Sequence, residues 1–266
     1  MAVAEHWRLP DQACALLCSD MHLGGHDPGT AAFFFSALDH VIDEATHLIL
    51  LGDVFEAWAG DDAIDPVAAR AIDRLTEIAR ERPVAIMRGN RDFLLDVPLA
   101  DPAVPAFSQR TGARMLAEPT LLELGGQRVL LGHGDAWCVD DHDYMAFRTL
   151  TRSAQWQRNF LALPRDQRLE IAQDLRKESR ARQSGDTMVF GDVDEATVRT
   201  LMRDSEVDWL IHGHTHRPDH HRIMDDGRER HRLVLPDWDA RDQRGGFIRL
   251  DRTGPSVLPA VARQRP

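Results

Sequence analysis

The amino-acid sequence predicts a layered α/β domain with a helical segment inserted into it. Short apolar runs alternate with stretches of helical periodicity, which is the pattern of strands and helices packed in layers. Each of five such runs is followed closely by aspartate, asparagine or histidine, usually beside glycine. This rhythm stops between residues 142 and 186. We therefore expect a core of residues 1–141 and 187–266 and an inserted helical cap of residues 142–186.

The five apolar runs are expected to be buried strands, because they are rich in leucine, isoleucine and valine and are bounded by turn-forming residues. They span residues 13–18, 48–51, 84–87, 129–131 and 209–211. Apolar side chains recur at helical spacing within residues 30–45, and Pro66 opens a second helical pattern where its missing N–H costs nothing. After Val234, short apolar stretches such as residues 246–250 predict further strands.

The expected cap has helical propensity, contains no strand-like run and is interrupted by Pro164. It holds nine basic and six acidic side chains, so it is locally positive in an acidic chain, which favours an anionic ligand. It also carries large apolar side chains, among them Tyr144, Phe147 and Trp156. For most of these, packing against the core is the plainer interpretation.

The composition excludes several classes of protein. The 266 residues include 43 acidic and 32 basic side chains, a net charge of −11, which excludes a generally basic nucleic-acid binder. Three cysteines without a C-x-x-C pair indicate neither a disulfide framework nor a thiolate zinc site. The apolar runs fall far short of the roughly 18 residues of a membrane-spanning helix, and no signal peptide is evident, so we expect a cytoplasmic protein. Lys177 is not preceded by glycine and no G-x-G-x-x-G follows a strand, which excludes both common nucleotide-binding loops.

Potential metal ligands cluster at the ends of the five expected strands. The clusters are Asp20-Met-His22, Gly52-Asp53, Gly89-Asn90-Arg91-Asp92, Gly132-His133-Gly134-Asp135 and Gly213-His214-Thr215-His216. Each alone has an ordinary structural interpretation, such as a turn or a hydrogen-bonded histidine. The carboxyl ends of strands in an open α/β sheet converge on one crevice, so we expect all five clusters to form one site.

The candidate ligands are carboxylates, an amide oxygen and imidazoles, which suit Mn²⁺, Fe or Zn²⁺. Seven ligands exceed the four of a tetrahedral site, so two ions fit better than one. A carboxylate such as Asp53 can bridge two ions roughly 3.5–4 Å apart.

The ordered set D-x-H, G-D, G-N-R-D, H-G-D and G-H-T-H resembles the calcineurin-like metallophosphoesterase superfamily, from Asp20 to His216. Longer strings, including L-G-D-V-F-E-A-W from Leu51, G-N-R-D-F-L-L from Gly89 and I-H-G-H-T-H-R-P from Ile211, resemble the UDP-2,3-diacylglucosamine hydrolases of lipid A synthesis. The resemblance implies a four-layer α/β/β/α sandwich with a helical cap.

The resemblance also assigns metal ligands. One Mn²⁺ would take Asp20, His22, Asp53 and His216, and a second would take Asp53, Asn90, His133 and His214. His212 would be a non-ligand, for which a hydrogen-bonded strand residue is an equally good interpretation. Asp92 and Asp135 are candidates for orienting the ligands, with surface or turn roles as the alternative.

Arg91 stands where the wider superfamily usually has a histidine after G-N. A guanidinium stays charged and cannot act as a general acid at neutral pH, so the substrate should need no acid. A pyrophosphate fits, because its leaving group is a phosphate whose second pKa is about 6. We expect Arg91 and Asp53 to be the catalytic residues, Arg91 by binding phosphate oxygens. An ion pair with Asp92 is the structural alternative for Arg91.

The implied reaction is hydrolysis of UDP-2,3-diacylglucosamine to UMP and 2,3-diacylglucosamine 1-phosphate by a water activated by two metal ions. Expected substrate contacts are Asn90, Arg91, Asp141, Tyr144, Arg176, Ser179, His214 and His216. Asp186 occupies a cap position where the family has a basic residue. The lipid substrate implies peripheral attachment to the inner membrane from the cytoplasmic side, with no nucleic acid and no obligate protein partner.

Two other functions share some of these features. A nucleotide phosphodiesterase or a protein phosphatase would use the same metal centre, but Arg91 and the cap argue against both. A non-catalytic binding scaffold on the same fold would be expected to lack ligands, and none of the seven is missing from this sequence.

Overall fold

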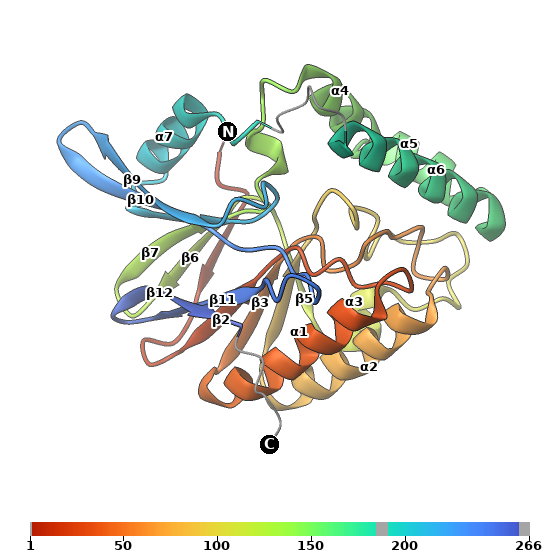
Figure 1. Ribbon diagram of the computed structural model, residues 1–266, viewed down its shortest axis with the longest axis horizontal. Coiled ribbons are helices and arrows are strands. Elements are labelled where there is room, and N and C mark those ends of the chain that lie inside the picture. Colours follow the sequence, from red (N-terminus) through yellow and green to blue (C-terminus); the bar gives the residue numbers. More distant parts are fainter. Residues whose placement is uncertain (1, 185–190, 261–266) are drawn as a thin grey trace.

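Two six-stranded sheets lie face to face at the centre of the molecule (Figure 1). The structure, a computed structural model, describes residues 2–184 and 191–260, with only the backbone described for residues 178–184. Helices cover the outer face of each sheet. The predicted α/β/β/α sandwich is therefore confirmed.

The first sheet contains three of the five predicted strands, which are parallel neighbours. Its order is β12 (Gly254–Pro259), β11 (Gly246–Asp251), β2 (Ala15–Cys18), β3 (His47–Leu51), β4 (Val84–Met87) and β5 (Arg114–Leu116). β11 runs antiparallel to β2 and β12, whereas β5 continues the parallel set. The carboxyl ends of β2, β3 and β4 therefore share one edge.

The second sheet contains the other two predicted strands, β7 and β8, which are also parallel. Its order is β1 (Glu5–Arg8), β6 (Thr120–Leu124), β7 (Gln127–Leu131), β8 (Trp209–His212), β10 (Arg228–Val234) and β9 (Asp219–Asp225). The five ligand clusters thus follow strands of two sheets, as the resemblance implies, and not of one open sheet.

The central strands are apolar along their whole length because both of their faces are buried. On β3, Leu48 and Leu50 face the outer helices, while Ile49 and Leu51 face the second sheet, as the twofold alternation of a strand requires. The inter-sheet core also contains residues from the facing strands, such as Val129. Burial on both faces explains why these strands appear in the sequence as unbroken apolar runs.

Helices α1 (Pro28–Val41) and α2 (Pro66–Glu81) cover the first sheet, and α3 (Phe107–Thr111) packs beside α2. The Asp27 and Asp65 side chains cap α1 and α2 by accepting hydrogen bonds from backbone N–H groups of the first turn, and each helix has proline at its start. A 3-10 turn, Ile42–Glu44, completes the pattern predicted for residues 30–45. On the other side, α7 (Glu195–Asp204) covers the second sheet.

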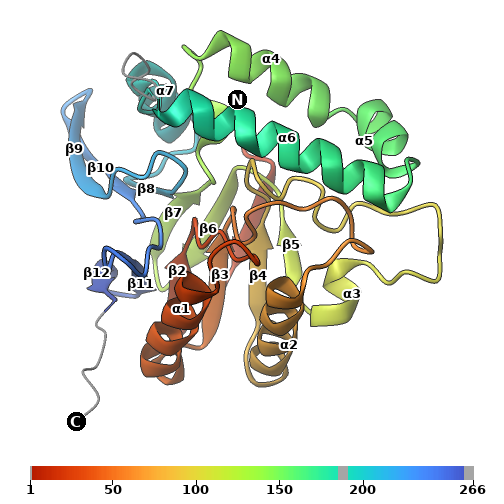
Figure 2. The same cartoon turned by 45° about the vertical axis from the view of Figure 1, so that its right-hand side comes forward.

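Three helices lie over the sheet edges where the parallel strands end (Figures 1 and 2). They are α4 (His142–Thr151), α5 (Ala154–Leu161) and α6 (Arg165–Ser184), all within the segment predicted to be helical. Phe160 and Leu161 of α5 belong to the apolar core that lies between the first sheet and helices α1 and α2. Over the described ranges, no helix combines the length and apolar character needed to cross a bilayer.

Candidate metal centre

The seven predicted ligands come together at the edges where β2, β3, β4, β7 and β8 end. Each lies on a strand end or in the loop that follows one, so two sheets position a single cluster. Within it, two groups of three side chains have donor atoms close enough to hold a cation. The groups are Asp20, His22 and His216, and Asp20, Asp53 and His133.

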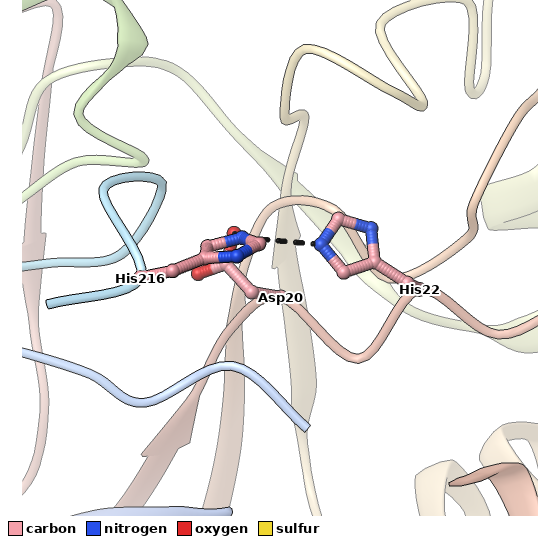
Figure 3. A group of neighbouring side chains, drawn as sticks. All are labelled: Asp20, His22 and His216. Atoms are coloured by element: carbon pink, nitrogen blue, oxygen red, sulfur yellow. Dashed lines mark hydrogen bonds and ion pairs between the residues drawn. The ribbon is translucent and has the colours of Figure 1, made fainter. Parts of the chain in front are cut away.

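The first group is drawn in Figure 3. The Nε2 atoms of His22 and His216 lie 3.3 Å apart, and His216 Nε2 lies 3.5 Å from Asp20 Oδ1. Two imidazole nitrogens that face one another beside a carboxylate form a donor set that suits Mn²⁺, Fe or Zn²⁺. His22 Nδ1 also lies 3.9 Å from Asp53 Oδ2, which connects this group to the second.

The second group is more deeply buried. His133 Nε2 lies 3.6 Å from Asp53 Oδ1 and 2.9 Å from Asn90 Oδ1. Asn90 Oδ1 is also 2.9 Å from His214 Nδ1. His133 is held from behind, because its Nδ1 lies 2.9 Å from the Leu51 carbonyl oxygen. Asp53 thus has one oxygen toward each group, the placement that a bridging ligand needs.

A divalent cation fits this cluster. Asp20 is fully buried, and its Oδ1 has no hydrogen-bond partner, whereas Oδ2 accepts from Ser19 Oγ at 2.6 Å and from the His214 N–H at 3.0 Å. A buried carboxylate oxygen without a partner is costly unless a cation neutralises it. Asp20 Oδ1 lies 3.5 Å from His216 Nε2, one of the imidazole nitrogens that would complete such a site.

The backbone around the cluster is unusual. Five of the seven predicted ligands have positive φ, namely Asp20 at 56°, His22 at 49°, Asp53 at 50°, His214 at 66° and His216 at 52°. Before Asp53, Gly52 has φ of 88°, and a Cβ there would lie 2.6 Å from His133 Nδ1. Tight left-handed turns therefore bring the ligands together, and the glycine leaves room for an imidazole.

Comparisons with known proteins agree with this geometry. Residues 15–218 match the family described as calcineurin-like phosphoesterase. The UDP-2,3-diacylglucosamine hydrolase of Bordetella parapertussis is 45% identical over 244 residues, which cover 90% of this chain and 92% of the relative. Proteins of the same name from Chromohalobacter salexigens and Stenotrophomonas maltophilia are 40% and 39% identical, each over 94% of this chain and over 98% and 99% of their own lengths. This chain belongs to the UDP-2,3-diacylglucosamine hydrolase family of calcineurin-like phosphoesterases.

Membership of this metallophosphoesterase family supports divalent-metal binding by the two candidate groups. Among solved structures, the cold-active protein-tyrosine phosphatase of a Shewanella species aligns with 97% of this chain and 83% of its own. Its TM-score of 0.47 and identity of 12% are too low to bear on the substrate.

Charges within the cluster shift the pKa values of its histidines. Burial disfavours the protonated form of His133, but the carboxylates of Asp53 and Asp20 outweigh it and raise the pKa of His133 to about 9. Burial, together with the charge of His133, lowers the pKa of His214 to about 3. Without a cation, the His133 proton therefore offsets part of the negative charge of the carboxylates.

Metal binding to this centre is expected to release a proton at neutral pH. The raised pKa leaves His133 protonated below about pH 9, and a metal ligand must be neutral imidazole. The apparent Mn²⁺ affinity should therefore fall about tenfold for each pH unit below that value. Titration calorimetry in two buffers of different ionisation enthalpy measures the released protons. An affinity that is unchanged between pH 6.5 and 8 would contradict this assignment.

Asp92 and Asp135 hold loops and helices around the ligands. Asp92 Oδ1 accepts from the Gly89 N–H at 2.7 Å and Oδ2 from the Val54 N–H at 2.8 Å, which ties the loop carrying Asn90 to the loop carrying Asp53. Asp135 Oδ2 accepts from Tyr144 Oη at 2.6 Å and from Arg148 Nε at 2.8 Å. Asp92 thus joins two ligand loops, and Asp135 joins the second sheet to α4.

His212 faces away from the cluster. Its Nδ1 lies 2.9 Å from the Gly213 carbonyl oxygen, its Nε2 lies 3.3 Å from Arg232 Nη1, and its ring packs edge-on against Trp137. Burial and the Arg232 charge lower the pKa of His212 to about 4, so the ring is neutral at pH 7. These contacts agree with the interpretation of a hydrogen-bonded strand residue.

The expected substrate contacts of the cap are placed unequally. Tyr144 stacks on His214, with ring centroids 6.0 Å apart, and Asp141 caps α4 by accepting from the Tyr144 N–H at 3.0 Å. Arg176 forms an ion pair with Glu56 in the loop after β3. Ser179 lies in the part of α6 whose side chains are outside the described set, and Asp186 lies outside the described residues. Among Asp141, Tyr144 and Arg176, whose side chains the structure describes, Tyr144 is thus the one whose ring packs on a predicted metal ligand.

Much of the positive charge of the cap is neutralised by core carboxylates. Arg148 pairs with Asp135 at 2.8 Å and with Glu118 at 3.0 Å. Arg152 lies 3.4 Å from Asp135 and donates to the Gly89 carbonyl oxygen at 2.9 Å. The local excess of basic residues therefore attaches the helices to the core, so charge counting within the segment overstates what is left for a ligand.

Three carboxylates close to the ligands were not predicted. Glu118 Oε1 accepts from the His133 N–H at 2.8 Å, Glu56 Oε2 lies 3.2 Å from His22 Nδ1, and Asp237 Oδ2 lies 3.6 Å from His216 Nδ1. Glu56 follows the second ligand cluster by three residues, which was the available signal. Glu118 and Asp237 stand apart from every ligand motif, and only the fold brings them there.

Proposed function

We propose that this protein hydrolyses the pyrophosphate bond of UDP-2,3-diacylglucosamine, with UMP and 2,3-diacylglucosamine 1-phosphate as products. The observation that carries the proposal is the place of Arg91. Arg91 directly follows the predicted ligand Asn90, and its backbone N–H donates to Asp53 Oδ1 at 2.8 Å, so an arginine stands where the wider superfamily usually has a histidine. The curated relatives that carry this activity as their name support the same substrate.

Two Mn²⁺ ions are proposed as cofactors. Asp20, His22, Asp53 and His216 would hold one, and Asp53, Asn90, His133 and His214 would hold the other. When bound, the ions supply Lewis acidity that lowers the pKa of a water molecule and neutralises charge on phosphate oxygens. The protein's part is to fix the ligands, which the loop contacts of Asp92 and the buried His133–Leu51 contact support.

Arg91 is proposed to bind the oxygens of the phosphate that is attacked. Its side chain is half-buried, and its charge lies close enough to Glu56 to help lower the pKa of that carboxyl. A planar guanidinium can bind two phosphate oxygens at once and stabilise the charge that builds up on them. No proton needs to pass from Arg91, because a phosphate is a weakly basic leaving group.

Helices α4 to α6 are proposed as the substrate cap, with residues 142–186 as its bounds. Tyr144, Asp141, Arg176 and Ser179 would contact the sugar and its phosphate. Phe147 and Leu150 of α4 and Ile171 of α6 are 36%, 56% and 37% exposed, and this apolar surface favours a lipid. The same surface supports peripheral attachment to the cytoplasmic face of the inner membrane.

The decisive experiment identifies the products and the atom attacked. Purified protein with Mn²⁺ is incubated in H₂¹⁸O with UDP-2,3-diacylglucosamine, UDP-N-acetylglucosamine or a phosphopeptide, and the products are analysed by mass spectrometry. We expect turnover of the acylated nucleotide only, with ¹⁸O in UMP. Label in the lipid phosphate would contradict attack beside uridine, and release of phosphate from the peptide would favour a protein phosphatase.

Arg91 variants test the non-acid role. Arg91→Ala should lower turnover about 10²–10³-fold, the usual cost of one electrostatic donor. Arg91→Lys should lose less activity because it keeps the positive charge. It should still be slower than the wild type, because lysine lacks the planar fork of the guanidinium. The pH–rate profile should keep its limbs, because Arg91 donates no proton. Loss of a limb in Arg91→Ala would show that Arg91 does take part in proton transfer.

A further inference from the structure

The two histidines of the first metal group are each backed by a carboxylate. Their Nε2 atoms lie 3.3 Å apart, and each Nδ1 atom has a carboxylate outside the set of seven ligands beside it, although His22 Nδ1 also lies 3.9 Å from Asp53 Oδ2. His22 Nδ1 lies 3.2 Å from Glu56 Oε2, and His216 Nδ1 lies 3.6 Å from Asp237 Oδ2. A carboxylate behind a metal-binding imidazole keeps the proton on the far nitrogen and leaves the near nitrogen free to bind the ion.

Each carboxylate is held in turn by an arginine. Glu56 Oε1 pairs with Arg176 Nη2. Both oxygens of Asp237 accept from Arg244, Oδ1 from Nε and Oδ2 from Nη2, each at 2.7 Å. The carboxylate side chains are only 9% and 10% exposed, so neither is free to swing into solvent. Each histidine thus lies at the end of a row of three side chains, an arginine, a carboxylate and the imidazole, which we call the Glu56 chain and the Asp237 chain.

The two chains differ in where the arginine comes from. Arg244 lies seven residues from Asp237 in the same loop between β10 and β11, so that chain is contained in the core. Arg176 lies 120 residues from Glu56 and comes from α6. The Glu56 chain therefore joins a predicted metal ligand to a cap helix that supplies none of the seven ligands.

We infer that Glu56 is a positioning residue for His22, and that Arg176 makes metal binding at the first group depend on the cap. The inference rests on the metal centre of the proposed function. Glu56 fixes the orientation of the imidazole, and Arg176 fixes Glu56. Detaching α6 then loosens His22, whereas His216 lies 3.6 Å from Asp237, whose partner Arg244 belongs to the core, and is not affected.

Mn²⁺ binding without substrate tests the role of Glu56. Electron paramagnetic resonance of free Mn²⁺ in a titration of the full chain gives the number of ions and the affinity of each. Glu56→Ala should weaken one of two ions about 10–100-fold, the usual effect of losing such a partner, and Glu56→Gln should be intermediate because it keeps the contact without the charge. Asp237→Asn is the matched control for the second chain, and circular dichroism checks that each variant is folded.

The sign of the Arg176→Ala effect tests the part played by the cap. If Arg176 positions Glu56, its loss should weaken Mn²⁺ binding about fivefold or more, and Arg176→Lys should restore part of it. If Arg176 acts only as a nearby positive charge, its loss should tighten binding, and the inference is overturned. Glu56→Ala with Arg176→Ala should be no weaker than Glu56→Ala alone, whereas Asp237→Asn with Arg176→Ala should be additive.

The outcome is separable from that of the proposed function. Wild-type Mn²⁺ affinity in Glu56→Ala would overturn the inference while leaving hydrolysis by the wild-type protein untouched. A wild-type protein that showed the expected binding pattern but no hydrolysis of the acylated nucleotide would leave the inference standing and remove the substrate assignment.

Discussion

Replacing Asp53 by alanine is expected to abolish hydrolysis and to remove both of the proposed metal ions. Asp53 is 2% exposed and belongs to the second candidate group, with Oδ1 3.6 Å from His133 Nε2, while its Oδ2 lies 3.9 Å from His22 Nδ1 of the first. It also accepts the Arg91 N–H, so its loss frees the turn that carries Arg91. The fall in turnover should exceed about 10³-fold, the upper end for a single electrostatic group. Asp53 is the proposed ligand of both ions and the acceptor for the Arg91 N–H, and all three roles are lost together.

His22→Ala is the comparison for this variant. His22 belongs only to the first group, so its loss should cost one ion and leave the second. Metal content after dialysis, measured by mass spectrometry, and turnover at limiting Mn²⁺ distinguish the two cases. Turnover of Asp53→Ala equal to that of His22→Ala would remove the bridging assignment.

Replacing Asp135 by asparagine is expected to detach α4. Asp135 is fully buried and accepts from Tyr144 Oη at 2.6 Å, Arg148 Nε at 2.8 Å and Arg152 Nη2 at 3.4 Å. Asparagine keeps an acceptor oxygen but removes the charge, and Arg148 keeps Glu118, so the loss should be that of weakened buried hydrogen bonds, about 1–3 kcal/mol. Urea denaturation should show that loss, and hydrogen exchange should show lower protection in residues 142–151.

Asp143→Asn is the matched control, because Asp143 is an exposed carboxylate on the same helix and its change should cost almost nothing. Activity on the acylated nucleotide should fall more than hydrolysis of a small activated phosphodiester, since Tyr144 would leave its place over His214. Equal losses on both substrates, with metal content intact, would argue against a recognition role for the cap. Point substitution is preferable to deleting the cap, which would leave Asp135 and Glu118 without their arginine partners.

Apolar patterning predicted the central strands of both sheets, most of whose residues are buried. β3 and β4 appear as unbroken apolar runs because sheet and helices enclose them, and α2 shows one apolar face. β9 and β10 were missed because they are rich in arginine, histidine and aspartate. Two of these arginines are nevertheless buried: Arg230 lies 3.4 Å from Asp225, and Arg232 lies 2.6 Å from Asp192. Buried arginines that pair with carboxylates, one within the hairpin and one 40 residues away, thus remove the apolar pattern by which a strand is predicted.

The candidate site also contains residues that the sequence predicts and residues that only the fold brings together. The candidate ligands could be selected from the sequence because metal chemistry demands particular side chains directly after strands, and glycine beside them. The division of these strands between two sheets came only from the family resemblance, because strand pairing leaves no trace in a short apolar run. Glu118 and Asp237 have ordinary neighbours in the sequence, and their relation to His133 and His216 exists only in three dimensions.

The left-handed backbone of five predicted ligands lowers the stability of the folded protein. Each such residue costs about 1 kcal/mol or more relative to an ordinary conformation, so the five together consume several kcal/mol of a net folding stability of about 5–15 kcal/mol. Random substitution towards glycine at these positions would relieve that cost and would remove the donors. Stability and metal binding therefore oppose one another at these positions, and a glycine there is expected to gain stability at the cost of a donor.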